Sequence, residues 1–181
     1  MALSEFELIA RFFDSPDFAV PDAEGVVLGV GDDAAILRLP PGEDLAVSVD
    51  TLVAGVHFPV ASSPEQIGHR ALAVNLSDLA AMGARPLWFT LALTLPEADE
   101  AWLAGFSRGL AAIARRFRVV LVGGDTTRGP LSITIQVHGS VPAGLALRRD
   151  GARPGDEVWV SGHPGTAALG LLVRAPTGDQ G

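Results

Sequence analysis

The chain has 181 residues, 21 acidic against 13 basic residues, a formal net charge of -8 and 48% hydrophobic residues. This length predicts one domain, or one domain and part of a second, and the apolar content suffices for a packed core. The sequence contains no Cys, Tyr or Lys, which excludes disulfides, zinc–thiolate sites, Cys nucleophiles, Schiff-base lysines, Tyr acids and Walker A loops.

The charge and the N-terminus predict where the protein acts. An acidic chain with scattered Arg is a poor nucleic-acid binder, because phosphate backbones are held by clustered positive charge. Residues 1–7 carry acids where a signal peptide has bases, and no apolar run approaches the roughly 18 residues that span a bilayer. We expect a cytoplasmic protein with no nucleic-acid or membrane partner.

Hydrophobic periodicity predicts alternating strands and helices along most of the chain. The predicted helices cover residues 4–13, 64–82, 96–117 and 167–173. The predicted strands cover residues 26–30, 34–39, 45–49, 87–95, 118–122, 131–141 and 157–160. Ser63 is placed to cap the second helix, with Pro64 at its first position and Gln66 completing a capping box. Gly83 and Pro86 end it.

A polar, turn-rich stretch at 148–155 indicates a domain boundary. We expect an N-terminal domain over residues 1–147. Residues 148–181 contain one strand–turn–helix unit with nothing to pack on, so we expect them to be the truncated start of a C-terminal domain.

Acidic residues recur where predicted strands end, at Asp32-Asp33, Asp50 and Asp125, and Asp78 lies on the helix over 64–82. Carboxylates at the ends of neighbouring strands can converge, and several carboxylates can bind Mg²⁺ bridged by substrate phosphates. The alternative is that each Asp simply favours a turn or a cap. Asp78 stands in an apolar run, where an unpaired acid is costly. Together these residues favour a metal site.

Two glycine motifs allow different interpretations. Residues 29–34 match G-x-G-x-x-[GA], with Asp50 about twenty residues on, as in a dinucleotide-binding fold. The following segment is short and β-like, however, and two carboxylates would repel a pyrophosphate unless a cation intervened. The second motif, at residues 122–127, follows a strand with a glycine pair, an acid and two threonines. It suits close approach to a ligand, or an ordinary tight turn.

Two further positions carry candidate binding groups. His57, seven residues beyond Asp50, could contact an anionic substrate or serve as a base, or it could be a loop histidine without a role. Arg148 and Arg149 could clamp a phosphate or form a solvated pair at the domain edge.

Four segments together resemble the bacterial thiamine-monophosphate kinase family, within the aminoimidazole ribonucleotide synthetase-like superfamily. They are Gly31-Asp32-Asp33-Ala34-Ala35, Asp50-Thr51-Leu52-Val53-Ala54-Gly55-Val56-His57-Phe58, Asn75-Leu76-Ser77-Asp78-Leu79-Ala80-Ala81-Met82-Gly83-Ala84 and Gly123-Gly124-Asp125-Thr126-Thr127-Arg128-Gly129. The resemblance implies ATP-dependent phosphorylation of thiamine monophosphate to thiamine diphosphate, assisted by several Mg²⁺ ions. It also implies an α+β fold with a mixed sheet, helices on one face and sheet pairing across a homodimer, followed by the start of a second α/β domain.

The same resemblance implies the site residues. The metal ligands would be Asp33, Ser48, Asp50, Asp78 and Asp125. The ATP-binding residues would be Gly124, Asp125 and Arg149, and His57 would contact the thiamine phosphate. No side chain is expected to act as a catalytic acid or base, because the acceptor is itself a phosphate and is mostly dianionic at neutral pH.

Three alternatives remain open at this point. A related ATP-dependent enzyme of the same superfamily could act on another substrate. An inactive fragment could fold and dimerise only. A dinucleotide-dependent oxidoreductase would rest on the glycines of residues 29–34 alone.

Overall fold

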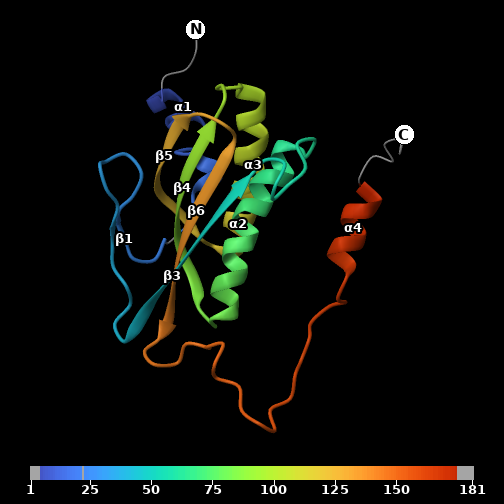
Figure 1. Cartoon of the computed structure of the whole chain (residues 1–181). Helices are drawn as coiled ribbons and strands as arrows, with labels where there is room; N and C mark the ends of the chain where they lie inside the picture. The colour runs from blue at the N-terminus through green and yellow to red at the C-terminus, as the bar shows by residue number, and fades with distance from the viewer. Residues whose placement is uncertain (1–4, 22, 175–181) are drawn as a thin grey trace. The chain divides into compact units, whose positions relative to one another are not determined.

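The computed structural model of the chain describes residues 5–21 and 23–174 (Figure 1). The chain divides into two compact units, residues 1–148 and 149–181. The helices of the first unit are α1 (Glu5–Phe12), a 3₁₀ turn η1 (Pro16–Phe18), α2 (Pro64–Ala81) and α3 (Glu100–Phe117). Its strands are β1 (Val26–Leu28), β2 (Ile36–Leu37), β3 (Glu43–Val53), β4 (Arg85–Leu95), β5 (Val120–Arg128) and β6 (Ser132–Pro142). The second unit contains α4 (Thr166–Arg174).

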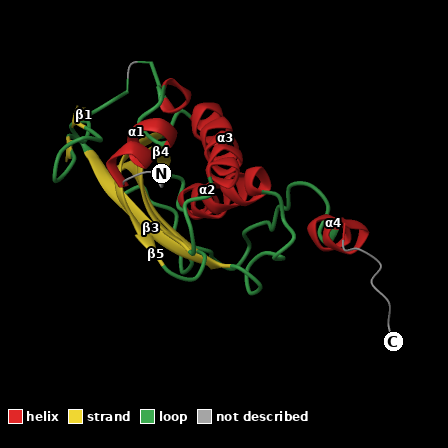
Figure 2. Ribbon diagram, turned by 90° about the horizontal axis from the view of Figure 1, so that it is seen from above, coloured by secondary structure: helices red, strands yellow, loops and turns green. Residues whose placement is uncertain are grey.

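Four strands form one mixed sheet in the order β3-β6-β4-β5. The β3–β6 and β6–β4 pairs are antiparallel, and the β4–β5 pair is parallel. The helices α1, α2 and α3 lie on one face of this sheet (Figure 2). The predicted α+β class, with a mixed sheet and helices on one face, is therefore confirmed.

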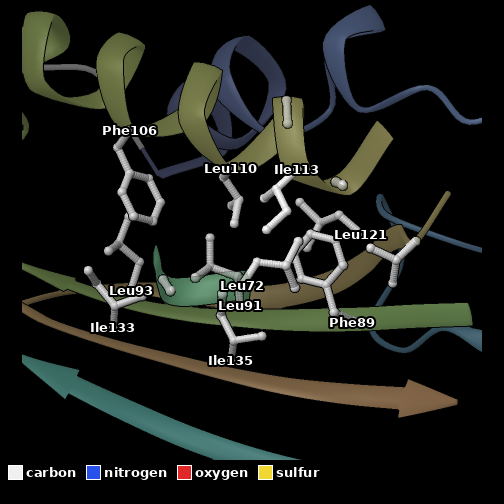
Figure 3. Packing of buried hydrophobic residues seen from close by; sticks show 14 of the residues in the cluster. Leu72, Phe89, Leu91, Leu93, Phe106, Leu110, Ile113, Leu121, Ile133 and Ile135 are labelled. Carbon is white, nitrogen blue, oxygen red and sulfur yellow. The ribbon is translucent and has the colours of Figure 1, made fainter. Parts of the chain in front are cut away.

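The main core lies between the sheet and its helices. Phe106 of α3 points toward Leu93 of β4, and Leu110 of α3 points toward Leu91 of β4 (Figure 3). Gly68 and Gly109 let α2 and α3 pack closely, since a Cβ at either position would collide with a backbone carbonyl of the other helix. Burial of these large apolar side chains supplies most of the favourable free energy of folding.

A smaller cluster forms on the opposite face of the sheet. Because side chains alternate along a strand, Trp88 points away from the helices while Phe89 points toward them. Trp88 and Val122 pack there against Val26 and Leu37 from the antiparallel pair β1–β2. The short β1–β2 hairpin is thus attached to the sheet by this cluster.

The two long helices begin differently from each other. The Ser63 hydroxyl accepts a hydrogen bond from the Gln66 amide at 3.3 Å, with Pro64 at the first position, so the predicted start of α2 is confirmed. The predicted start of α3 at Pro96 is wrong. Asp99 caps α3 instead, because its carboxylate accepts hydrogen bonds from the two amides of residues 101 and 102.

Two predicted strand boundaries are also wrong. β3 and β5 run past the expected ends, so Asp50 and Asp125 lie within strands rather than after them. Residues 157–160 form no strand, and Val158 and Trp159 are 93% and 85% exposed. An extended segment needs a partner to complete its hydrogen bonds, and none pairs with this segment among residues 5–21 and 23–174. No helix in the described part of the chain is long and apolar enough to cross a membrane.

Candidate functional site

A cavity of about 560 Å³ lies beside β5, the edge strand of the sheet. It joins segments that are far apart in the sequence, from α1, the β1–β2 loop, β4 and β5. Its polar lining includes Asp32, Asp33, Asp125 and Thr126. Its apolar lining is contributed by Ile9, Phe13, Val30, Ala34, Ala35, Leu91, Leu121 and Val122. The cavity therefore has both carboxylates and an apolar wall.

One wall is the loop of residues 29–35 between β1 and β2, which we term the acidic arm. Asp32 Oδ1 accepts a hydrogen bond from the Asp33 amide at 2.8 Å, so Asp32 stabilises the turn of its own loop. Gly31 adopts a φ of 116°, which favours glycine. The Asp33 carboxylate is exposed at the cavity, where it can bind a cation.

The facing wall is β5 at its glycine pair. A Cβ on Gly124 would collide with the Leu91 carbonyl of β4, whereas a Cβ on Gly123 would meet open space. Gly124 is thus required for the close approach of β4 and β5. Asp125, the next residue, is exposed and lines the same cavity as the acidic arm. The structure therefore brings together Asp33, Gly124 and Asp125 of the predicted site.

A second polar group lies between β3 and α2. Ser48 Oγ donates a hydrogen bond to Asp78 Oδ2 at 2.7 Å. Asp78 is exposed and is hydrogen-bonded to a strand of the sheet, so it is not the unpaired acid that would be costly in an apolar run. Asp50 is half-buried two residues beyond Ser48, on the same side of β3 by strand alternation.

The two groups occupy opposite edges of the sheet. Asp50 on β3 and Asp125 on β5 are separated by β6 and β4. Three inter-strand spacings place their backbones roughly 14 Å apart. Among residues 5–21 and 23–174, no three His, Asp or Glu side chains are close enough to hold one metal ion.

His57 lies in the tight turn that follows β3. Its Nδ1 accepts a hydrogen bond from the Val53 amide at 3.0 Å, so a neutral ring carries its proton on Nε2. The side chain is exposed, which leaves the Nε2–H able to meet a ligand. Arg149 belongs to the second unit and is exposed there.

Asn75 is fully buried in α2 and belongs to the same motif as Asp78. Its Nδ2 donates to the Ala71 carbonyl at 2.9 Å, while its Oδ1 has no hydrogen-bond partner among the described residues. A buried amide oxygen without a partner carries an energetic cost.

Sequence reasoning missed the apolar wall of the cavity. Ile9 and Phe13 were recognisable only as one face of a short helix, because periodicity shows that a face is apolar and not what it covers. It also missed the contacts that hold the acidic arm in place. The available signal in the sequence was Gly25, a glycine directly before a predicted strand. In the structure its φ is 72°, a conformation that favours glycine.

Comparison with known proteins identifies the family. A family model described as "AIR synthase related protein, N-terminal domain" matches residues 31–141, which include the sheet from β3 to most of β6. The chain belongs to this family. The match contains Asp33, Ser48, Asp50, Asp78 and Asp125, and α1 and Arg149 lie outside it.

Two relatives with similar sequences are both named thiamine-monophosphate kinase. The chain is 56% identical over 173 residues to thiamine-monophosphate kinase of Salmonella typhimurium and 55% identical to that of Escherichia coli K12. Each alignment covers 96% of this chain and 52% of the relative. The chain thus spans about half the length of these relatives.

The solved structures that resemble this chain include thiamine-monophosphate kinases as well. Thiamine-monophosphate kinase from Stenotrophomonas maltophilia K279a superposes with a TM-score of 0.81 and 52% identity, over 96% of this chain and 54% of that chain. The structure described as AaThiL complexed with AMPPCP and TMP gives a TM-score of 0.68 and 32% identity over the same shares of the two chains. This AIR synthase related chain therefore has the N-terminal fold of known thiamine-monophosphate kinases.

Proposed function

We propose that this protein transfers the γ-phosphoryl group of ATP to thiamine monophosphate, giving thiamine diphosphate. The observation that carries the proposal is the cavity that the acidic arm lines together with Gly124 and Asp125. The names of the similar proteins, and the complex of one of them with AMPPCP and TMP, support the same reaction. Phosphoryl transfer needs a site that binds several phosphates, and this cavity offers cation-binding carboxylates beside a glycine.

The donor set fits Mg²⁺, which prefers oxygen ligands. We propose that Asp33 and Asp125 hold Mg²⁺ at the cavity, and that Ser48, Asp50 and Asp78 hold Mg²⁺ at the β3 edge. All five side chains offer carboxylate or hydroxyl oxygens, and none of the five is fully buried. When bound, Mg²⁺ would neutralise the charge of the phosphates, which a chain without Lys needs.

The residues of the chain would act by binding and orientation. Gly124 would contact ATP through its backbone, next to the open space at Gly123, and Arg149 would bind ATP with a planar guanidinium. His57 would donate its Nε2–H to the thiamine phosphate. An acceptor phosphate with a second pKa near 6 is already mostly ionised at neutral pH, so no side chain has to remove a proton. Catalysis would consist of positioning and charge stabilisation of an in-line transfer.

We further propose a cytoplasmic homodimer formed through the sheet. Leu45, Val47 and Val49 of the edge strand β3 are about half exposed on the face away from the helices. An exposed edge strand with apolar side chains favours pairing with another strand. We also propose that residues 148–181 begin a C-terminal domain, because their apolar side chains Val158, Trp159 and Leu172 are largely exposed.

The test is a turnover assay of this chain. The chain is incubated with ATP, Mg²⁺ and thiamine monophosphate, and thiamine diphosphate is measured by chromatography. We expect product that depends on all three components. ATP consumption independent of thiamine monophosphate would contradict the proposed substrate and favour a related ATP-dependent enzyme.

A second candidate is a chain that folds and dimerises without turnover. The observation that favours it is the shared length, since the chain spans about half of each similar kinase. Absence of product together with a cooperative melt and a dimer in solution would support this candidate and contradict kinase activity of the chain.

A further inference from the structure

The acidic arm is weakly supported by its own hairpin. β1 and β2 contain three and two residues, and their ladder has only two paired positions. A two-stranded hairpin of this size is at best marginally stable in water. The position of Asp33 at the cavity therefore depends on contacts outside the hairpin.

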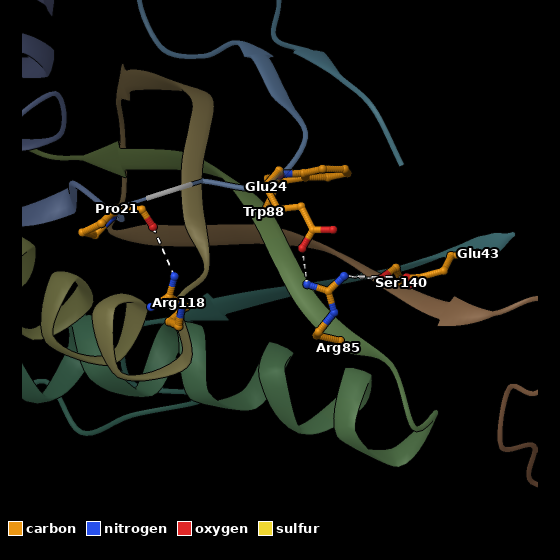
Figure 4. Close-up of polar contacts among 7 residues, drawn as sticks. All are labelled: Pro21, Glu24, Glu43, Arg85, Trp88, Arg118 and Ser140. Atoms are coloured by element: carbon orange, nitrogen blue, oxygen red, sulfur yellow. Dashed lines mark hydrogen bonds and ion pairs between the residues drawn. The ribbon is translucent and has the colours of Figure 1, made fainter. Parts of the chain in front are cut away.

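Those contacts converge on Glu24 and Gly25, immediately before β1 (Figure 4). The Trp88 indole N–H donates to the Glu24 carbonyl at 2.8 Å. The Arg85 guanidinium donates to the Glu24 carboxylate at 2.6 Å. Trp88 and Arg85 both belong to β4, so the chain segment leading into the acidic arm is attached to an interior strand of the sheet.

Gly25 makes this attachment tight. A Cβ at Gly25 would collide with the Arg38 carbonyl and with the Trp88 ring, and its φ of 72° favours glycine. The Arg38 amide, just after β2, donates to the Gly25 carbonyl at 2.8 Å. The two ends of the hairpin that carries the acidic arm are thus joined to each other at Gly25 and Arg38, and Gly25 packs against the Trp88 ring.

Arg85 is itself held in place. It lies 3.4 Å from the Ser140 hydroxyl of β6 and 3.8 Å from the Glu43 carboxylate of β3. The hydrogen bond that Arg85 donates to Glu24 raises the pKa of Arg85 above its ordinary value, with burial opposing the shift and the charges of Glu24 and Glu43 adding to it. The guanidinium stays charged at any working pH.

From these contacts we infer that Arg85 and Trp88 are positioning residues that hold the acidic arm, and with it Asp33, against the ligand cavity. Their polar partners described above are Glu24, Glu43 and Ser140, and we assign none of these three to substrate binding. They act through Glu24 and Gly25 on the base of the hairpin. The functional part of this inference rests on the proposed role of the cavity, and its structural part does not.

The structural part can be measured without a ligand. The chain has no Cys, so spin labels at Ala34→Cys in the arm and Arg108→Cys on α3 would be unique. We expect Arg85→Gln to make the distance distribution about twice as wide, because local opening becomes easier. Arg85→Lys, which keeps the ion pair, should restore the narrow distribution. The matched control is Arg70→Gln, the same change at an exposed residue of α2.

The functional part uses unlabelled protein and the ATP analogue AMPPCP with Mg²⁺, measured by calorimetry. We expect Arg85→Gln to weaken binding about threefold with little change in melting temperature, since a half-exposed ion pair makes only a small contribution to the free energy. Glu24→Gln should weaken binding equally, and the double variant should be no worse than either single variant. Trp88→Phe, which removes the N–H donor together with part of the ring that packs beside Gly25, should act in the same direction.

The outcomes separate the two parts. An unchanged distance distribution in both Arg85→Gln and Trp88→Phe would overturn the positioning role. A wider distribution with unchanged AMPPCP binding would overturn the assignment of the arm to the nucleotide site and leave the positioning role intact. A wild-type chain that binds no AMPPCP would contradict the nucleotide site itself, while the distance measurement would still decide the positioning role.

Discussion

The two edges of the four-stranded sheet differ in how completely the chain covers them. The β5 edge meets α1 and the acidic arm, which together enclose the cavity. The β3 edge leaves Leu45, Val47 and Val49 exposed over an eleven-residue strand. The comparison indicates that the chain builds a cavity from its own segments on one side, while the exposed apolar strand on the other side is where we propose that a second chain pairs.

The largest effect is expected from replacing the Asp50 carboxylate on β3. Asp50→Asn keeps the size of the side chain and removes its charge, so it should abolish the proposed turnover, with a loss of about 100-fold or more. The assay is thiamine diphosphate formation under saturating ATP. Near-normal activity would contradict the metal assignment at this edge and leave only the β5 edge as a site.

Gly124→Ala should disturb the pairing of β5 with β4. The new Cβ would collide with the Leu91 carbonyl, so β5 must move away from β4 and the cavity must change shape. We expect AMPPCP affinity to fall about tenfold or more. Gly123→Ala is the matched control, since its Cβ meets open space. Equal effects of the two substitutions on affinity would contradict the close-approach argument.

Val47→Arg tests whether the β3 edge is an interface. A charge in the middle of the apolar stripe should weaken the proposed dimer at least about tenfold, because it would be desolvated on association. Sedimentation equilibrium gives the dissociation constant. Val60→Arg, at an exposed loop residue outside the sheet, is the control. A wild-type chain that is monomeric at all concentrations would contradict the proposed dimer.

The smallest expected effect is a pH dependence at His138 of β6, which pairs with Val47 and Trp88. Burial lowers its pKa, and its buried Nδ1 has no partner among the described residues. The unfolded chain therefore binds a proton more readily, so stability is full above the ordinary histidine pKa of about 6.5 and falls as the pH drops below it.

Replacement of this histidine should remove that dependence. Thermal melts of the wild type and of His138→Leu between about pH 7.5 and pH 5.5 should show a smaller loss of stability in the variant. A parallel decline in both proteins would assign the acid sensitivity to other groups.

Local features of the fold were predictable from the sequence. The start of α2 follows from Ser63 and Pro64, whose effects act over a few residues. β6 follows from its alternating apolar residues. The start of α3, in contrast, was predicted wrongly. Pro96 and Asp99 can both begin a helix, and the hydrogen bonds that Asp99 accepts from two backbone amides decide between them.

The arrangement of the site could be predicted only in part. The glycine pair and the acids near strands indicated a cation-binding site, and the structure places Asp33 and Asp125 at one cavity. Strand order depends on long-range packing, so the sequence alone could not place Asp50 and Asp125 on opposite edges. The attachment of Glu24 to β4 joins residues about sixty positions apart, and no local pattern indicates it.

Calorimetric titration of AMPPCP into this chain, first with Mg²⁺ and then with chelator, tests most directly whether the β5 edge holds a metal-dependent nucleotide site. We predict binding that requires Mg²⁺ and is lost in Asp125→Asn but retained in Arg70→Gln. Binding that persists in chelator, or that Asp125→Asn leaves unchanged, would contradict the account.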